Sequence, residues 1–212
     1  MPPKPKFTRE EIVLAAYDMA AARGIDAVMA REVGKAMGST ARPIFTVFSG
    51  MDELKEEVRA LAMRRCLEDL SGAFDYEPAF KEFGMRWVRF ALEQPHLYSL
   101  LFSRVAGPDA VKASFGKLTA RIIDSAMREF GLSPARAEAL LDRMIVYSNG
   151  IAAFALNGDA KFSQALLARS LSEVCIALVI RFQMLDDQFN PAAMRQMLMD
   201  PDRIPNRVSD AP

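Results

Sequence analysis

The stretch from Ser39 to Thr46 combines short hydroxyl side chains with an arginine. The hydroxyl groups can donate and accept hydrogen bonds, and Arg42 can pair with a guanine edge or with a phosphate oxygen. Thr40 is one of these short side chains, and Ala41 beside it is small enough to contact the methyl group of thymine. On one face of a helix, these side chains would suit contact with the base edges of double-stranded DNA.

Other chemistry has little support in the sequence. A single histidine and two distant cysteines provide no cluster of zinc ligands, and we expect no cofactor. We expect Cys66 and Cys175, which lie in apolar helical patterns, to be buried free thiols. His96 follows Pro95 at a predicted helix start, where a surface or capping role is commoner than a role as pocket ligand or pH switch.

The first helix that must position the polar stretch begins near the N-terminus. Thr8 and Glu11 have the spacing of a capping box, in which each side chain binds the backbone amide of the other residue. Apolar residues then recur at helical spacing. Gly24 ends the pattern, because glycine readily takes a positive φ at a helix C-terminus.

Two short helices follow, over residues 30–37 and 40–47, with Gly38 at the turn between them. Pro43 is tolerated only in a first turn, so the later helix must begin between Ser39 and Arg42. This is the arrangement of a helix-turn-helix, which places its second helix in the major groove. Spacing alone is equally consistent with an ordinary helical hairpin in a bundle.

The rest of the chain also has helical periodicity, without strand-like alternation or an internal repeat. We expect Ser49 to cap a fourth helix that fades near Gly72, and five further helices to follow, the last ending near residue 185. The predicted fold class is therefore all-α. We divide the chain into a helix-turn-helix DNA-binding domain (1–50), a helical effector-binding and dimerisation domain (51–190), and a weak helix with a loose tail (191–212).

Charge distribution is compatible with this division but does not require it. The chain has 27 basic and 27 acidic residues. Residues 1–50 hold seven basic and five acidic residues, a net charge of +2, which leaves −2 for the remainder. A basic excess of this size permits binding to DNA without demanding it.

Residues 7–54 resemble the N-terminal domain of the TetR family of bacterial regulators. The likeness covers FTREEIVLAAYDMAAARGIDA, REVGKAMGST and RPIFTVFSGMDELKEEV. The most specific part is the junction in which an apolar and an aromatic residue, two variable residues and Phe48 precede a short turn and an acidic helix start ending in Leu54. The family often has Thr or Ser where Val28 and Met29 stand, and a lysine where Met51 stands, so some contacts to the DNA backbone are weakened here.

The resemblance implies a homodimer that binds a near-palindromic DNA operator and responds to a small effector, most simply as a repressor. We expect a cytoplasmic protein, because the N-terminal residues MPPKPKF do not have the pattern of a secretory signal. The residues that we expect at DNA are Lys6, Arg31, Ser39, Thr40, Ala41, Arg42, Phe45 and Thr46.

The C-terminal part is expected to bind a small apolar or amphipathic effector, because it is rich in large side chains that could line a pocket. Ordinary core packing explains each of them as well. The candidate lining residues are Trp87, Phe90, Tyr98, Phe102, Phe115, Met144 and Tyr147.

The last two long helices offer more apolar surface than a small core needs, and small residues among them would allow close helix contact. The resemblance implies a four-helix interface between two chains at this place. The candidate interface residues are Leu141, Ser148, Ile151, Ala152, Leu167, Leu171, Val174 and Leu178.

Two alternatives stand beside the regulator. One is an all-helical adaptor that binds another protein through the apolar faces of its last two helices and has no DNA function. The other is an all-helical enzyme, for which the sequence offers no arrangement of acid, base or nucleophile. A membrane protein is not expected, since the most apolar run, 174–185, is short and carries Arg181.

Overall fold

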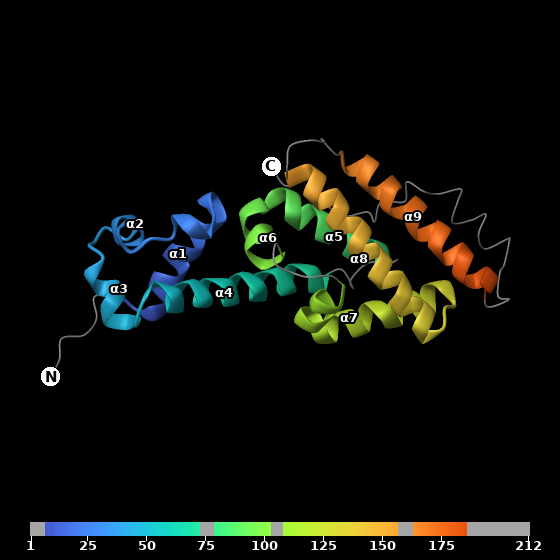
Figure 1. Ribbon diagram of the computed structural model, residues 1–212, viewed down its shortest axis with the longest axis horizontal. Helices are drawn as coiled ribbons and strands as arrows, with labels where there is room; N and C mark the ends of the chain where they lie inside the picture. Colours follow the sequence, from blue (N-terminus) through green and yellow to red (C-terminus); the bar gives the residue numbers. More distant parts are fainter. Residues whose placement is uncertain (1–6, 73–78, 103–107, 157–162, 186–212) are drawn as a thin grey trace. The chain divides into compact units, whose positions relative to one another are not determined.

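The computed structural model describes residues 7–72, 79–102, 108–156 and 163–185. Within these ranges the chain forms α-helices, one short 3-10 helix and no strand, so the predicted all-α class is confirmed (Figure 1). The helices are α1 (Arg9–Arg23), α2 (Ala30–Ala36), α3 (Arg42–Val47), α4 (Met51–Ser71), α5 (Ala79–Glu93), α6 (Pro95–Phe102), α7 (Pro108–Phe130), α8 (Pro134–Leu156) and α9 (Gln164–Leu185), with the 3-10 helix at Ile25–Ala27.

The chain packs as two compact units. The first comprises Met1–Glu68 and Glu93–Val105, and the second comprises Asp69–Leu92 and Ala106–Pro212. The predicted DNA-binding domain, residues 1–50, lies wholly within the first unit, which also includes most of α4 and all of α6. The predicted tail, 191–212, lies outside the described residues.

The start and end of α1 are as predicted. The Thr8 hydroxyl accepts a hydrogen bond from the amide of Glu11 at 3.2 Å, and the amide of Thr8 donates to the Glu11 carboxylate at 2.8 Å. Gly24 ends the helix with φ +85° and ψ 162°, a conformation that is almost restricted to glycine. The inner face of α1 includes Ile12, Ala16 and other buried residues, which form part of the core of the first unit.

The second unit is a bundle in which α8 contacts both α7 and α9. Two arginines of α8, Arg136 and Arg143, place their guanidinium carbons 5.5 and 5.1 Å from the ring centre of Phe182 on α9. Helix α7 is interrupted at Gly116, whose φ of +31° and ψ of −101° are not helical. The sequence pattern does not indicate this kink, because the apolar periodicity continues across it.

Candidate nucleic-acid interface

The turn between α2 and α3 depends on two glycines. Gly38 has φ +65°, as expected for the residue that reverses the chain. Gly34, inside α2, accepts a hydrogen bond at 2.8 Å from the amide of Ser39. A Cβ atom at Gly34 would lie 2.4 Å from the carbonyl oxygen of Thr40 and 2.9 Å from the amide of Ala41. The two helices of the motif can therefore approach this closely only because residue 34 has no side chain.

Helix α3 begins at Arg42 rather than at Thr40, with Ala41 as its N-cap residue and Pro43 in its first turn. This start lies within the interval that Pro43 requires. The Thr40 hydroxyl lies 3.4 Å from the amide of Arg42 and accepts its hydrogen bond, while the Thr46 hydroxyl donates to the carbonyl of Pro43 at 2.7 Å. Both hydroxyl groups therefore help to complete the short helix, and each retains an oxygen lone pair for an outside donor.

The predicted DNA-contacting side chains share one exposed region. Thr40, Arg42 and Thr46 are exposed, Ser39 and Ala41 are half-buried, and Phe45 is 54% exposed. Phe45 is the large apolar side chain that α3 exposes, and it suits contact with thymine methyl groups. Lys6 lies outside the described residues.

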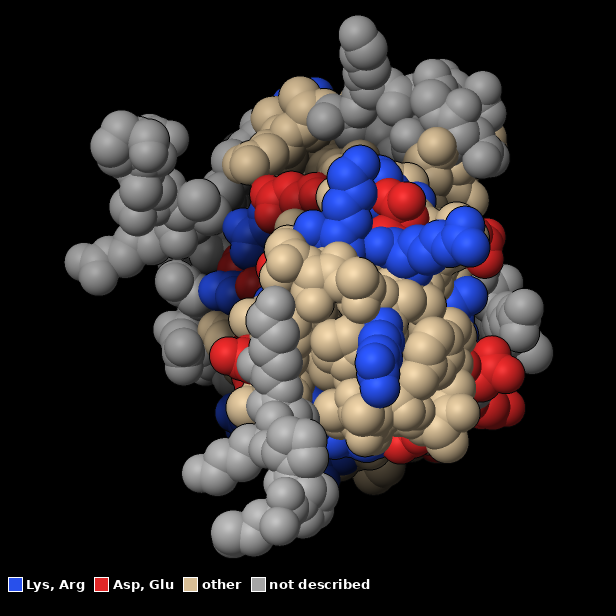
Figure 2. Space-filling view, turned by 90° about the vertical axis from the view of Figure 1, so that its left-hand side faces the viewer, with Lys and Arg blue, Asp and Glu red and all other residues tan. Residues whose placement is uncertain are grey.

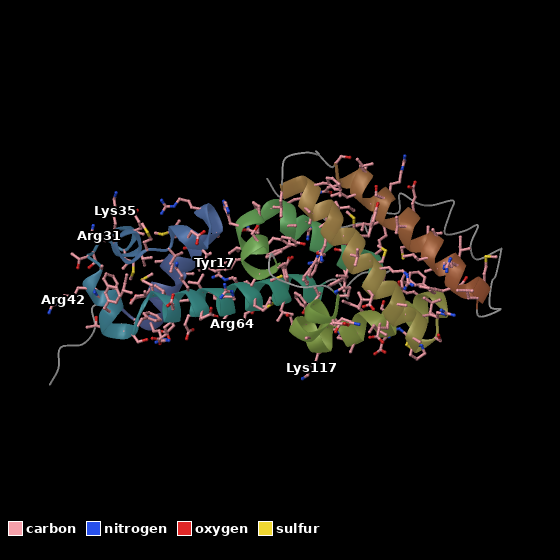
Figure 3. The ribbon with its side chains drawn as sticks, viewed as in Figure 1. Tyr17, Arg31, Lys35, Arg42, Arg64 and Lys117 are labelled. Atoms are coloured by element: carbon pink, nitrogen blue, oxygen red, sulfur yellow. The ribbon has the colours of Figure 1, made fainter. Side chains whose placement is uncertain are left out.

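Exposed cations flank this region on α2. Arg31, Lys35 and Arg42 point outward from α2 and α3 (Figure 3). Among the described residues, none of the three is in a salt bridge. Figure 2 shows basic side chains on a mostly uncharged surface at this end, with acidic side chains mainly toward its margins. Unpaired cations beside short polar side chains are the combination that phosphate contacts and base contacts require.

The link from α3 to α4 is held by an ion-pair network that the sequence interpretation missed. Arg9 donates to Glu53 at 2.6 Å, to Glu57 at 3.0 Å and to the carbonyl of Val47 at 3.3 Å. Glu53 in turn accepts from both the amide and the hydroxyl of Ser49, each at 2.7 Å. The prediction that Ser49 caps α4 is therefore wrong, because its hydroxyl donates to a carboxylate instead of accepting from a backbone amide.

These contacts have an electrostatic consequence. The hydrogen bonds from the amide of Ser49, from Arg9 and from the hydroxyl of Ser49 lower the pKa of Glu53 to about 2. The same carboxylates raise the pKa of Arg9 above its ordinary value, first through Glu53 and then through Glu57. Both groups therefore stay charged across the whole physiological range.

The candidate effector residues fall in both units. Trp87 and Phe115 are buried in the second unit and meet edge to face, with ring centres 5.5 Å apart. The Trp87 indole donates to the side-chain oxygen of Asn149 at 3.1 Å. Of the remaining candidates in this unit, Met144 is buried, and Phe90 and Tyr147 are half-buried. Tyr98 and Phe102 belong to α6 in the first unit, where their rings lie 5.1 Å apart. The pocket itself stays a prediction.

Most of the predicted dimer residues lie inside the second unit. Six are buried within a single chain, so they offer little area to a partner: Leu141, Ser148, Ile151, Ala152, Leu167 and Leu171. The other two, Val174 and Leu178, are half-buried. The exposed large apolar residues of the two helices stand at other positions, namely Val146 and Phe154 on α8, and Leu166, Met184 and Leu185 on α9. The helical period alone does not separate a face toward the core from a second face toward a partner.

Some expectations on other residues can also be compared with the structure. Cys66 and Cys175 are buried and free, as predicted, and burial raises the pKa of Cys175 to about 12. His96 is exposed. Among the described residues no helix has the length and apolar character needed to cross a membrane, and no group of potential metal ligands is found.

Comparisons with known proteins support the predicted family resemblance through the C-terminal part of the chain. Residues 80–178 match the family described as tetracyclin repressor-like, C-terminal domain. A TetR-family transcriptional regulator from Streptomyces coelicolor has a similar fold, with a TM-score of 0.65 and 20% sequence identity over 91% of this chain and 88% of that chain. No curated protein matches the sequence. The predicted resemblance to the TetR family is therefore confirmed, and the chain combines a tetracyclin repressor-like C-terminal domain with the fold of a TetR-family regulator.

Proposed function

We propose that this chain is a sequence-specific transcriptional regulator that binds double-stranded DNA through α2 and α3. The observation that carries the proposal is the exposed surface of α3, where Arg42, Phe45 and Thr46 stand beside Arg31 and Lys35 of α2. Short side chains allow a helix to approach base edges closely, and the adjacent cations can neutralise phosphates.

An operator selection with the purified chain tests this proposal. We expect one preferred sequence, and we expect Thr40→Ala and Arg42→Ala to weaken discrimination in a gel shift at fixed salt, by roughly 5- to 150-fold where a bidentate base contact is lost. Arg64→Ala is the matched control, because Arg64 is an exposed arginine on α4, away from α2 and α3 (Figure 3). Intact discrimination in both the Thr40→Ala and the Arg42→Ala variant would show that α3 is not the recognition helix.

The regulator acts as a homodimer through the exposed apolar residues of α8 and α9. Two-fold symmetry then places two copies of α3 one DNA turn apart, roughly 34–36 Å, on a near-palindromic operator. Sedimentation should show a dimer that Phe154→Glu weakens, since Phe154 is 59% exposed. Leu14→Glu, an exposed apolar position on α1, should leave the dimer intact.

A small apolar or amphipathic effector binds in the second unit and acts on DNA binding, most simply as the inducer of a cytoplasmic repressor. Helix α4 provides a route, because it runs from Met51 to Ser71 and belongs to both units. A coupling of about 1–3 kcal/mol changes DNA affinity by roughly 5- to 150-fold. Trp87 is the single tryptophan of the chain, so its fluorescence reports on candidate ligands directly. Ligand turnover in place of simple binding would favour an enzyme.

A second candidate, a protein-binding adaptor, is favoured only by the exposed apolar residues of α8 and α9. A measurement of molecular mass in solution distinguishes the adaptor from the dimeric regulator. A stable homodimer covers those residues and argues against the adaptor, whereas a monomer that selects no DNA supports it.

A further inference from the structure

Helix α3 has few contacts of its own to fix its orientation. It has six residues, and of their side chains only that of Ile44 is buried. A helix of under two turns with one buried side chain can rotate about that contact at small cost, because most helical stability in proteins comes from a packed apolar face. The contacts at its two ends must therefore determine how it is presented to a ligand.

The N-terminal end is fixed by the backbone contact between Gly34 and residues 40–41. The C-terminal end is fixed by Arg9, which comes from the first turn of α1. Its guanidinium donates to the carbonyl of Val47, the last residue of α3, and lies 4.3 Å from the ring centre of the buried Phe48. Arg9 thus binds the backbone at the end of α3 and covers the buried side chain of Phe48, the residue that follows the helix.

The same guanidinium reaches the other side of the link. It pairs with Glu53 and Glu57, one turn apart on α4. Glu53 then uses its second oxygen to accept from the amide and the hydroxyl of Ser49. Residues 47 to 49 are consequently held from both flanks, by Arg9 on one and by Glu53 on the other.

The charge of Arg9 is already matched within the protein. Its side chain is 37% exposed, yet two carboxylates lie within 3.0 Å of one guanidinium nitrogen. A phosphate brought to this place would meet the two carboxylates as well as the cation. Arg31 and Arg42 have no such partners among the described residues.

We propose that Arg9 is a positioning residue for α3, which sets the orientation of this helix between α1 and α4 and thereby controls sequence discrimination without contacting DNA. This inference rests on the proposed function. It separates Arg9 from the exposed arginines of α2 and α3, which bind DNA directly under the same proposal.

The test compares Arg9→Gln with Arg42→Gln in the full-length chain, on the selected operator and on an unrelated duplex, over a series of salt concentrations. We expect Arg9→Gln to lower operator affinity by roughly 5- to 150-fold, the loss expected when a reoriented α3 gives up one of its own bidentate base contacts. The slope of log K against log salt should stay unchanged, because Arg9 neutralises no phosphate. Arg42→Gln should reduce the slope by about 1 if Arg42 binds a phosphate, and relax discrimination if it binds a base. A reduced slope for Arg9→Gln, or unchanged operator affinity, overturns the positioning role.

Arg9→Lys guards against a variant that fails to fold. Lysine keeps the positive charge and one ion pair but lacks the planar fork that reaches Val47, Glu53 and Glu57 together. We expect a melting temperature close to that of the parent chain together with lowered operator affinity, and parental affinity in this variant counts against the proposal. If the parent chain selects no duplex at all, the proposed function fails and the positioning role falls with it. If the parent chain selects an operator and Arg9→Gln discriminates as well as the parent, only the positioning role fails.

Discussion

Replacing Gly34 with valine should disrupt the turn between α2 and α3, because the chain approaches itself closely at this glycine. In the structure, a Cβ atom at this position would lie 2.4 Å from the carbonyl oxygen of Thr40 and 2.6 Å from its carbonyl carbon, where ordinary contacts are 3.4–4 Å. The shortfall of about 1 Å is against backbone atoms, so no side chain can rotate to relieve it. Overpacking of this kind typically costs about 1–3 kcal/mol. Valine recovers only a few tenths of a kcal/mol through its better helix propensity than glycine.

The expected loss corresponds to a fall of roughly 2–12 °C in melting temperature for a chain of this length, measured by circular dichroism. DNA affinity should fall further, because relief of the clash moves residues 40–41 at the start of α3. Ala36→Val is the control, since it adds a β-branched side chain at an exposed position of the same helix and should cost less than about 0.7 kcal/mol. If the two variants melt together and bind DNA equally well, the close approach at Gly34 does not hold the turn.

Three further changes probe other contacts. Gly24→Ala should cost roughly 1–3 kcal/mol in thermal unfolding, because φ +85° with ψ 162° strains any other residue. Gly150→Ala, inside α8 and with no atom within 4 Å of the added Cβ, should be neutral or slightly stabilising; equal effects would contradict the strain. Glu53 has a pKa of about 2 in the folded protein, below its ordinary value of 4.5, so its stabilisation is present above pH 4.5 and is lost as the pH falls toward 2. Glu53→Gln should therefore make the free energy of unfolding less dependent on pH in that window. An unchanged pH dependence of stability between pH 4.5 and 2 would count against the network. Lys112→Met should destabilise the second unit by about 1–2 kcal/mol at pH 7, because Lys112 pairs with both Glu138 and Asp142 of α8. The destabilisation should be smaller near about pH 3, where carboxylates become protonated. A destabilisation independent of pH would indicate lost packing instead of lost ion pairs.

How far the sequence predicts this protein depends on the distance over which each feature is determined. Capping at Thr8, the glycine at residue 24 and the turn at Gly38 depend on residues within five positions, and the structure confirms all three. Pro43 likewise restricts where α3 begins. Each of these signals concerns the local backbone, so it can be deduced without knowledge of the packing.

Features that depend on residues distant in sequence cannot be predicted from such local signals. Arg9 and Glu53 are 44 positions apart, and each taken alone is an ordinary charged residue near the start of a helix. Gly34 gives a weak signal, because a glycine inside a predicted helix is unfavourable and suggests some packing reason, but the partner backbone cannot be identified from spacing. The burial of Leu141 and Leu167 has the same cause, since both faces of α8 and α9 are apolar and only the packed bundle decides which face is inward.

Local features and contacts between residues distant in sequence together determine how α3 is presented to DNA. The side chains that face outward are determined locally, by a short helix with a proline in its first turn. Their direction is determined by Gly34 at one end and Arg9 at the other, each contacting a segment that precedes or follows α3. A substitution at either anchor should therefore alter recognition while every outward side chain stays the same. Specificity in this protein would then depend on the framework of α1, α2 and α4 as much as on the surface of α3, and a change of operator preference need not require a change at any residue that contacts a base.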